Sequence, residues 1–357
     1  MEKLSPNQSR LECDLRKINF TTTEDHDMFV PYTHESIRLT GRWDQSSPSC
    51  AVTTTTGSYI EFCFEGNMAV ARFDIEANMQ PLLHLWVQID GGDMTEATVD
   101  RYMRVCTTKS GLHTVRIIYK SGTEASARWY LPLTGKVTFL GVQTDNPVAI
   151  APDNRPVIEF VGDSITEGVL IDVDFAKGGP LFTEIDALCR CYQDDVCATY
   201  AWLTAQKLNL RPVFMGYGAV GATRPGMGRV PDAPSAYPFN FENSPITHAP
   251  SDFVVINHGA NDRRAAPEFY RECYEKLLDE VIKYNPRATV VALSAFCGGH
   301  KDVFAEMIPA YNQKNGTNVL FVNGSEWVPA EPLHPLRDGH QIIADNLAPI
   351  LKDLFKL

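Results

Sequence analysis

The feature that most constrains the fold is an abrupt change of pattern at Ala151–Pro156, a polar segment that contains two prolines. Before it, residues 36–143 form short runs rich in β-branched and aromatic residues, without helical segments between them. After it, short apolar runs alternate with stretches that carry apolar residues at helical spacing. Strands alone favour antiparallel pairing, whereas alternating strands and helices favour a parallel sheet. The sequence therefore predicts two domains, 1–150 and 151–357, joined by this connector.

The first domain is predicted to be an all-β sandwich of the jelly-roll type. Its expected strands are SIRLTGRW, SYIEFCF, AVARFDI, LLHLWVQID, LHTVRIIYK and VTFLGVQ, separated by turn-forming clusters such as Asp90–Gly92. Sandwich domains often bind sugars through exposed aromatic side chains, and Trp43, Trp86 and Trp129 are available for this role.

The second domain is predicted to be an α/β unit whose parallel sheet is covered by helices on both faces. The expected strands include VIEFVG, DFVVINHG, TVVALSAF and NVLFVN, and the expected helices are CATYAWLTAQKL, PEFYRECYEKLLDEVIKY and HQIIADNLAPILKDLF. Ligands of open parallel sheets bind outside the carboxyl ends of the strands. We therefore expect the chemistry in the loops that leave the strands.

Charge and cysteine content exclude several classes of function. The net charge is −12 and no cluster of Lys and Arg is present, so neither nucleic acid nor an anionic membrane is an expected partner, and neutral substrates fit better. The N-terminal residues lack the apolar core of a signal peptide, which predicts a cytoplasmic protein. The nine cysteines have irregular spacing and are interpreted as reduced thiols. The cluster Cys189, Cys191 and Cys197 lacks a paired CxxC, so no metal is expected there.

Ser164 lies in the first of these loops, directly after the strand VIEFV. At a strand-to-helix turn, free N–H groups and the helix dipole favour negative charge that develops beside a serine. Ser164 is thus placed like a nucleophile, although Ser164 or Thr166 would equally serve as a simple helix cap. The Gly-x-Ser-x-Gly elbow of the α/β-hydrolases is absent around it, which disfavours that fold.

Two further loops supply candidate hydrogen-bond donors. Gly221, in MGYGAVGA, is placed to aim its N–H at an oxyanion, but the segment would also suit a plain turn. It lacks the Gly-Lys-Ser/Thr of a phosphate-binding loop. Asn261, in HGAND after FVVIN, has a side-chain amide that would donate to the same oxyanion. Each of these signals is weak when it is read alone.

A serine nucleophile needs a base, and a base with a pKa near neutrality is usually histidine. His334, in the segment EPLHPLRDGH before the last helix, is free to reach the first loop. His340 is in phase with Ile343, Leu347 and Leu351, which predicts a structural position on the buried stripe of that helix.

Taken in order, Gly-Asp-Ser-Ile, a glycine, Gly-x-Asn-Asp and His-Pro before an apolar helix resemble the SGNH (GDSL-type) hydrolase superfamily over 156–357. The resemblance implies a flavodoxin-like three-layer α/β/α fold and ester hydrolysis without metal or cofactor. It implies that Ser164 is the nucleophile and first oxyanion donor, that Gly221 and Asn261 complete the hole, and that His334 is the base. The β-rich domain is similar to the N-terminal jelly roll of two-domain carbohydrate esterases. This similarity implies removal of acetyl groups from saccharide hydroxyls.

Three possibilities remain for the group that orients His334. The family places an Asp three residues before the histidine, and Glu331 occupies that position here. Asp338 is the alternative acid, although it falls where a helix cap or first-turn residue is expected. In some two-domain esterases of this kind a backbone carbonyl replaces the acid.

Other residues near the expected active face are candidate substrate contacts, namely His258, Arg224, Trp327 and His300. Two alternative functions also fit the sequence. One is a lipid esterase or thioesterase with the same catalytic groups, and the other is a glycan-binding protein without activity. The sequence does not indicate an oligomeric state.

Overall fold

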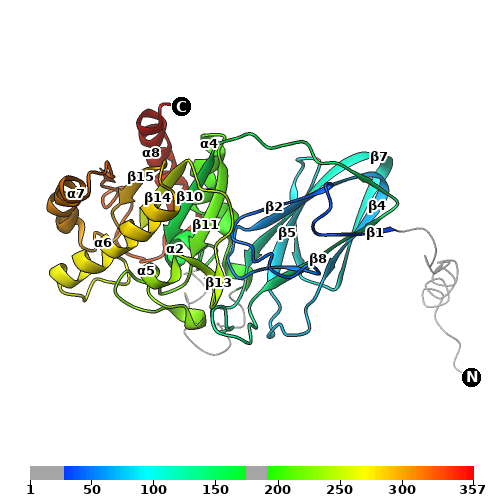
Figure 1. Cartoon of the computed structure of the whole chain (residues 1–357), viewed down its shortest axis with the longest axis horizontal. Helices are drawn as coiled ribbons and strands as arrows, with labels where there is room; N and C mark the ends of the chain where they lie inside the picture. Colours follow the sequence, from blue (N-terminus) through cyan, green and yellow to red (C-terminus); the bar gives the residue numbers. More distant parts are fainter. Residues whose placement is uncertain (1–27, 174–190) are drawn as a thin grey trace, which may run out of the picture.

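The computed structural model describes residues 28–173 and 191–357, which form a β-rich domain and an α/β domain that contact each other along one side (Figure 1). The strands of the β-rich domain end with β9 (Asn146–Val148), and the parallel sheet begins with β10 (Val157–Gly162). Within these two ranges, no helix combines the length and the apolar character that a bilayer-spanning segment needs.

The β-rich domain contains a nine-stranded antiparallel sheet that curls around an apolar core. Its strand order is β1-β8-β4-β7-β5-β6, with β2 and β9 paired to β4 and β3 paired to β8. The remaining strand bounds are β1 (Met28–Pro31), β2 (Ile37–Thr40), β3 (Ala51–Thr53), β4 (Tyr59–Phe73), β5 (His84–Ile89), β6 (Met94–Thr98), β7 (Tyr102–Ser121) and β8 (Val137–Thr144). The predicted all-β class is confirmed.

Two strands are longer than the sequence pattern predicts. SYIEFCF and AVARFDI belong to one 15-residue strand, β4, which pairs with the 20-residue β7. The register of this pair shifts between Gly66 and Met68, and Gly66 has a φ of +146°. A glycine bulge lets a long strand bend without ending, so the turn-like residues in the middle of β4 do not separate two strands.

The tryptophans of this domain do not form an exposed sugar-binding surface. Trp43 and Trp129 are 2% and 4% exposed. Trp129 packs in the apolar cluster of the α/β domain, and the half-buried Trp86 donates its Nε1–H to Asp195 Oδ1 at 2.9 Å. Their aromatic surface is used within and between the two domains, so the proposed role in sugar binding is wrong for Trp43 and Trp129.

The α/β domain has a five-stranded parallel sheet in the order β11-β10-β14-β15-β16. In chain order this is 2-1-3-4-5, the flavodoxin-like arrangement that was expected. The other strand bounds are β11 (Arg211–Gly216), β14 (Phe253–Asn257), β15 (Thr289–Leu293) and β16 (Leu320–Val322). The strand order reverses between β10 and β14, and in such sheets this point is where ligands bind.

Helices cover both faces of the parallel sheet (Figure 1). Alternation along β14 directs Val254 and Ile256 into the cluster that contains α5, α6 and α7, and Val255 into the cluster that contains α4 and α8. Their bounds are α4 (Tyr200–Lys207), α5 (Ala233–Ala236), α6 (Pro267–Tyr284), α7 (Lys301–Asn315) and α8 (Arg337–Phe355). Shorter elements are α2 (Ser164–Glu167), η2 (Val196–Ala198), η3 (Met227–Arg229), β12 (Phe239–Phe241) and β13 (Ser244–Pro245).

Helix α7 was not predicted. Pro309 lies inside it, and its N-cap, His300, makes no side-chain capping hydrogen bond. Both features are atypical of helices. The signal that would have found it is the spacing of its buried residues, Phe304, Met307, Ile308 and Tyr311.

Candidate active site

Ser164 is the first residue of the one-turn helix α2, directly after β10 and at the point where the strand order reverses. Asp163 caps the helix, because its Oδ1 accepts the Ile165 N–H at 3.0 Å. Asp163 is the cap, whereas the sequence analysis considered Ser164 or Thr166 for this role. The side chain of Ser164 is therefore not occupied by capping.

The Oγ of Ser164 lies 2.8 Å from the Nε2 of His334, 170 positions later in the chain. The loop before α8 brings the histidine over the end of β10, as the ordered motifs predict. A hydroxyl within hydrogen-bond distance of an imidazole is the contact needed for removal of its proton. The two groups are thus arranged as a nucleophile and its base.

Neither candidate acid contacts this histidine. Glu331 is exposed and makes no hydrogen bond or ion pair with the described residues. Asp338 lies in the first turn of α8, as expected, and accepts the N–H of Gly339 at 2.8 Å. The expectation that Glu331 orients His334 is not met, because its carboxylate faces solvent and not the imidazole.

We expect Glu331→Gln to retain kcat for p-nitrophenyl acetate within about twofold of wild type, because no hydrogen bond to His334 is lost. Asp338→Asn, which changes the other candidate acid, should behave in the same way. A fall in kcat of about a hundredfold or more in either variant would show that this carboxylate acts through the histidine.

Asn261 follows β14 and lies beside the nucleophile loop. Its Nδ2 donates to the carbonyl of Val220 at 3.0 Å and to Oδ2 of Asp163 at 3.3 Å. Burial, followed by the nearby charge of Asp262, raises the pKa of Asp163 to about 7. The amide has the expected place but both of its hydrogens are engaged, so an oxyanion must replace one of these acceptors. Hydrogen bonds in active sites often rearrange in this way when substrate binds.

Gly221 is not arranged as an oxyanion donor in this structure. Its N–H donates to the carbonyl of Arg224 at 3.0 Å, which closes a turn. A side chain at this position would meet the carboxylate of Asp262, since a Cβ would lie 2.4 Å from Oδ1. The glycine is therefore required by close packing, and the predicted donor role would require this turn to open.

Asp262 joins the second and third motif loops, a role that the sequence analysis missed. Its carboxylate accepts the N–H groups of Ala222 and Thr223 at 3.1 and 2.8 Å, and the Thr223 hydroxyl at 2.6 Å. The carbonyl of Asp262 accepts the Nε2–H of His300 at 2.7 Å. Of the two adjacent residues in the Gly-x-Asn-Asp pattern, only Asn261 was predicted from the sequence to have a role.

Comparison with protein families identifies the family of the α/β domain. Residues 160–342 match the family described as GDSL-like Lipase/Acylhydrolase, and this span includes Ser164, Gly221, Asn261 and His334. The chain belongs to this family. It is accordingly a carboxylic ester hydrolase of the GDSL type. A search of curated protein sequences gave no match.

Several solved structures are similar to this GDSL-like hydrolase over both of its domains. A family two carbohydrate esterase from Cellvibrio japonicus has 20% sequence identity and a TM-score of 0.76, over 92% of this chain and 98% of that one. An acetyl xylan esterase from Butyrivibrio proteoclasticus has 18% identity and a TM-score of 0.73, over 93% and 99%. A family two carbohydrate esterase from Clostridium thermocellum, in complex with cellohexaose, has 21% identity and a TM-score of 0.69, over 90% and 99%. At these identities the likeness establishes the two-domain fold.

The candidate substrate contacts of this hydrolase have different surroundings. His258 is fully buried at the end of β14, and burial lowers its pKa to about 4. The expectation that it contacts substrate at the surface is therefore not met. His300 stacks on Tyr270 with ring centroids 4.2 Å apart. Trp327 is half-buried and packs near Phe296. Arg224 is exposed next to the turn that contains Gly221, so its position remains compatible with a substrate contact.

His340 has the structural position that its helical phase predicts. It is fully buried, its Nδ1 accepts the N–H of Tyr200 at 3.0 Å, and its ring stacks with that of Tyr200. Burial is the main cause that lowers its pKa to about 3, so the ring is neutral and serves packing.

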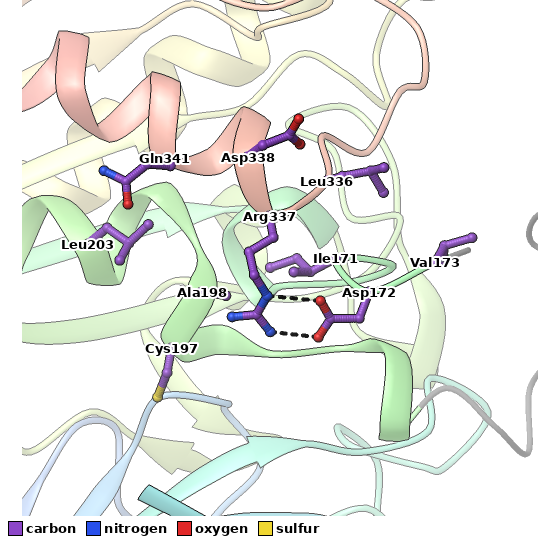
Figure 2. Close-up of a pocket in the computed structure, with 10 residues that line it drawn as sticks. All are labelled: Ile171, Asp172, Val173, Cys197, Ala198, Leu203, Leu336, Arg337, Asp338 and Gln341. Atoms are coloured by element: carbon purple, nitrogen blue, oxygen red, sulfur yellow. Dashed lines mark hydrogen bonds and ion pairs between the residues drawn. The ribbon is translucent and has the colours of Figure 1, made fainter. Parts of the chain in front are cut away.

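A pocket of about 870 Å³ lies between the start of α8, the segment after α2, and η2 with α4 (Figure 2). Ser164, Asn261 and His334 do not line it. Arg337, at its edge, donates to Asp172 at 2.9 and 2.6 Å and to the buried Asp195 at 3.2 Å. These bonds tie the start of α8, three residues after the base, to the segment that follows the nucleophile helix.

The cysteines of the hydrolase give no sign of a metal centre in the described part of the chain. Cys191 and Cys197 are buried, and Cys189 lies outside the described residues. No group of three or more His, Cys, Asp or Glu side chains within 28–173 and 191–357 could hold a metal ion.

Proposed function

We propose that this hydrolase removes short acyl groups, chiefly acetyl, from hydroxyls of carbohydrates through an acyl-enzyme on Ser164. The contact between Ser164 Oγ and His334 Nε2, at 2.8 Å, is the observation that carries the proposal. The carbohydrate alcohol is supported by the two-domain likeness to structures described as carbohydrate esterases. The family description, Lipase/Acylhydrolase, also covers lipid esters, which makes the acyl group the property to test.

In the proposed reaction, His334 accepts the proton of Ser164 while the oxygen attacks the ester carbonyl. The oxyanion is held by the N–H of Ser164 and by the amide of Asn261, which exchanges one of its present acceptors for the substrate. The C–O bond to the sugar then breaks, and the alcohol leaves with the proton from His334. Water, activated by the same histidine, releases the carboxylic acid and restores Ser164.

The test is hydrolysis of p-nitrophenyl acetate, butyrate and octanoate, together with acetate release from acetylated xylo-oligosaccharides. An acetyl-specific site should give a kcat/KM at least about tenfold higher for acetate than for octanoate, because a small pocket cannot accept six further methylenes. Acetate should also be released from the sugar. A flat profile, or a preference for octanoate, would favour a lipid esterase or thioesterase and contradict the proposed substrate class.

A further inference from the structure

The nucleophile is carried by a very short helix, whose position must be fixed from outside. Helix α2 has four residues, and a single isolated turn is unstable because helix nucleation is unfavourable. Its own domain holds the start through the Asp163 cap and the middle through the Thr166 hydroxyl, which lies 2.9 Å from the Tyr200 hydroxyl. At the other end, the α/β domain contributes a hydrogen bond from the Asp195 N–H to the carbonyl of Gly168 at 2.9 Å, and Glu167 adds contacts to the other domain.

Side chains of the β-rich domain hold Glu167. Its carboxylate accepts a hydrogen bond from Nη1 of Arg128, in the loop after β7, and its carbonyl accepts the hydroxyl of Thr56 at 3.3 Å. Arg128, Thr56 and Glu167 are 0%, 1% and 3% exposed. A charge pair so deeply buried interacts strongly, because little water screens it.

Arg128 is itself fixed in place. Its guanidinium lies 5.3 Å from the centre of the Tyr217 ring, and its backbone N–H donates to the carbonyl of Gly228 at 3.0 Å. Both partners belong to the α/β domain, so the arginine is enclosed by that domain. Movement of the guanidinium away from Glu167 would disturb its contact with the Tyr217 ring.

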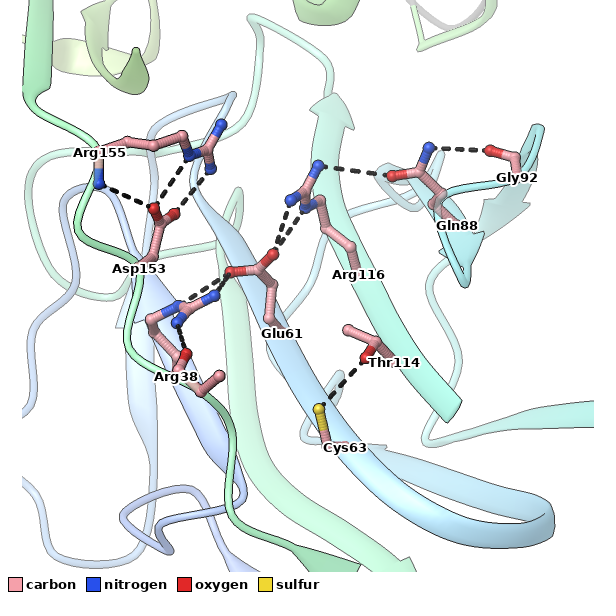
Figure 3. Close-up of polar contacts among 10 residues, drawn as sticks. Arg38, Glu61, Cys63, Gln88, Gly92, Thr114, Arg116, Asp153 and Arg155 are labelled. Atoms are coloured by element: carbon pink, nitrogen blue, oxygen red, sulfur yellow. Dashed lines mark hydrogen bonds and ion pairs between the residues drawn. The ribbon is translucent and has the colours of Figure 1, made fainter. Parts of the chain in front are cut away.

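The domain that supplies Arg128 is docked along the connector as well. Arg38, on β2, donates to the carbonyl of Ala151 at 2.7 Å and also binds Glu61 (Figure 3). Within the connector, Arg155 pairs with Asp153 at 2.7 Å and holds the pKa of that carboxyl at about 2. The bond from Arg38 thus holds the start of the connector against the β-rich domain.

We propose that Arg128 and Glu167 are positioning residues, through which the β-rich domain holds α2 so that the Oγ of Ser164 faces His334. The inference rests on the proposed serine-esterase function. The physical reason is that attack requires the reacting groups to be aligned closely, and a displacement of about 1 Å can lower the rate a hundredfold. This role explains why residues from two domains meet at the end of the nucleophile helix.

The alternative is that the pair only docks the two domains, and a second pair allows this to be tested. Arg42 of the β-rich domain donates to Glu159 at 2.8 Å, and the two side chains are 1% and 0% exposed. Glu159 lies inside β10, which is held on both sides by β11 and β14. Arg42 also donates to the carbonyls of Tyr237 and Phe239. Loss of the pair between Arg42 and Glu159 should weaken domain docking at least as much as loss of the pair between Arg128 and Glu167. It should do so without moving α2.

The experiment compares R128M/E167M with R42M/E159M in the full chain, since apolar replacement of both partners leaves no lone buried charge. Each is measured for kcat and KM with p-nitrophenyl acetate and for its thermal midpoint. We expect R128M/E167M to lose at least about tenfold in kcat with KM changed by less than about threefold. The control should keep kcat within about twofold at a similar or lower midpoint.

Two results would overturn the positioning role, namely an unchanged kcat in R128M/E167M or an equal fall in both variants. If R128M/E167M does not fold, Arg128→Lys and Arg42→Lys take the place of the double variants, because lysine keeps the charge but lacks the planar guanidinium. A kcat that falls in Arg128→Lys but not in Arg42→Lys then supports the positioning role. An equal fall of kcat in the two variants opposes it. An inactive wild type would instead contradict the proposed function.

Discussion

Ser164→Ala is expected to lower kcat for p-nitrophenyl acetate by about 10⁵-fold or more, because the acyl-enzyme cannot form without the hydroxyl. The fold should persist. The serine side chain is small, its hydroxyl hydrogen-bonds to His334, and the cap of α2 is supplied by Asp163. This is the largest effect that the proposed mechanism predicts.

Covalent labelling provides the control for this variant. A serine-reactive fluorophosphonate should label one residue per chain in the wild type and none in Ser164→Ala, while the thermal midpoints of the two proteins stay close. Residual activity above about 1% in a folded Ser164→Ala protein would contradict the assignment of the nucleophile.

Asn261→Ala is expected to lower kcat by about a hundredfold to a thousandfold, the range seen when one oxyanion donor is removed. KM should change much less, because the amide is needed most when negative charge develops on the carbonyl oxygen. The alanine variant also loses the hydrogen bonds to Val220 and Asp163, so some loss of stability should accompany the loss of rate.

The matched control is Asn346→Ala. Asn346 is exposed on α8, twelve residues after His334, and its amide donates to the carbonyl of Ile342 at 2.8 Å. It should keep the kcat of the wild type. If Asn261→Ala lost less than about tenfold in kcat, the amide would not be a principal oxyanion donor.

Much of the secondary structure of the α/β domain can be predicted from the spacing of hydrophobic residues close together in the sequence. The apolar run of β14 and the amphipathic pattern of α6 predict those elements closely, because burial of one face depends on local spacing. The order of the four motifs then predicts that Ser164 meets His334, since parallel strands bring their carboxyl ends to one edge of the sheet.

The same patterns do not predict contacts that depend on exact backbone direction. Gly221 matches its motif, yet its N–H points to Arg224 within a turn. Glu331 has the family's spacing to the histidine, yet it faces solvent. A change in the backbone dihedral angles of one loop residue redirects an N–H group or a side chain. It leaves the spacing of hydrophobic residues unchanged, so the sequence pattern carries little information about these directions.

Residue patterns along the chain were enough to predict the two kinds of domain, the parallel sheet and the meeting of Ser164 with His334. Only the tertiary structure decided what surrounds them: the burial of His258 and Trp43, the tie from Asp262 to Ala222 and Thr223, and the pair between Arg128 and Glu167. Periodicity records which side of an element is buried, whereas the contact between Arg128 and Glu167 joins side chains of two domains and forms only when those domains pack.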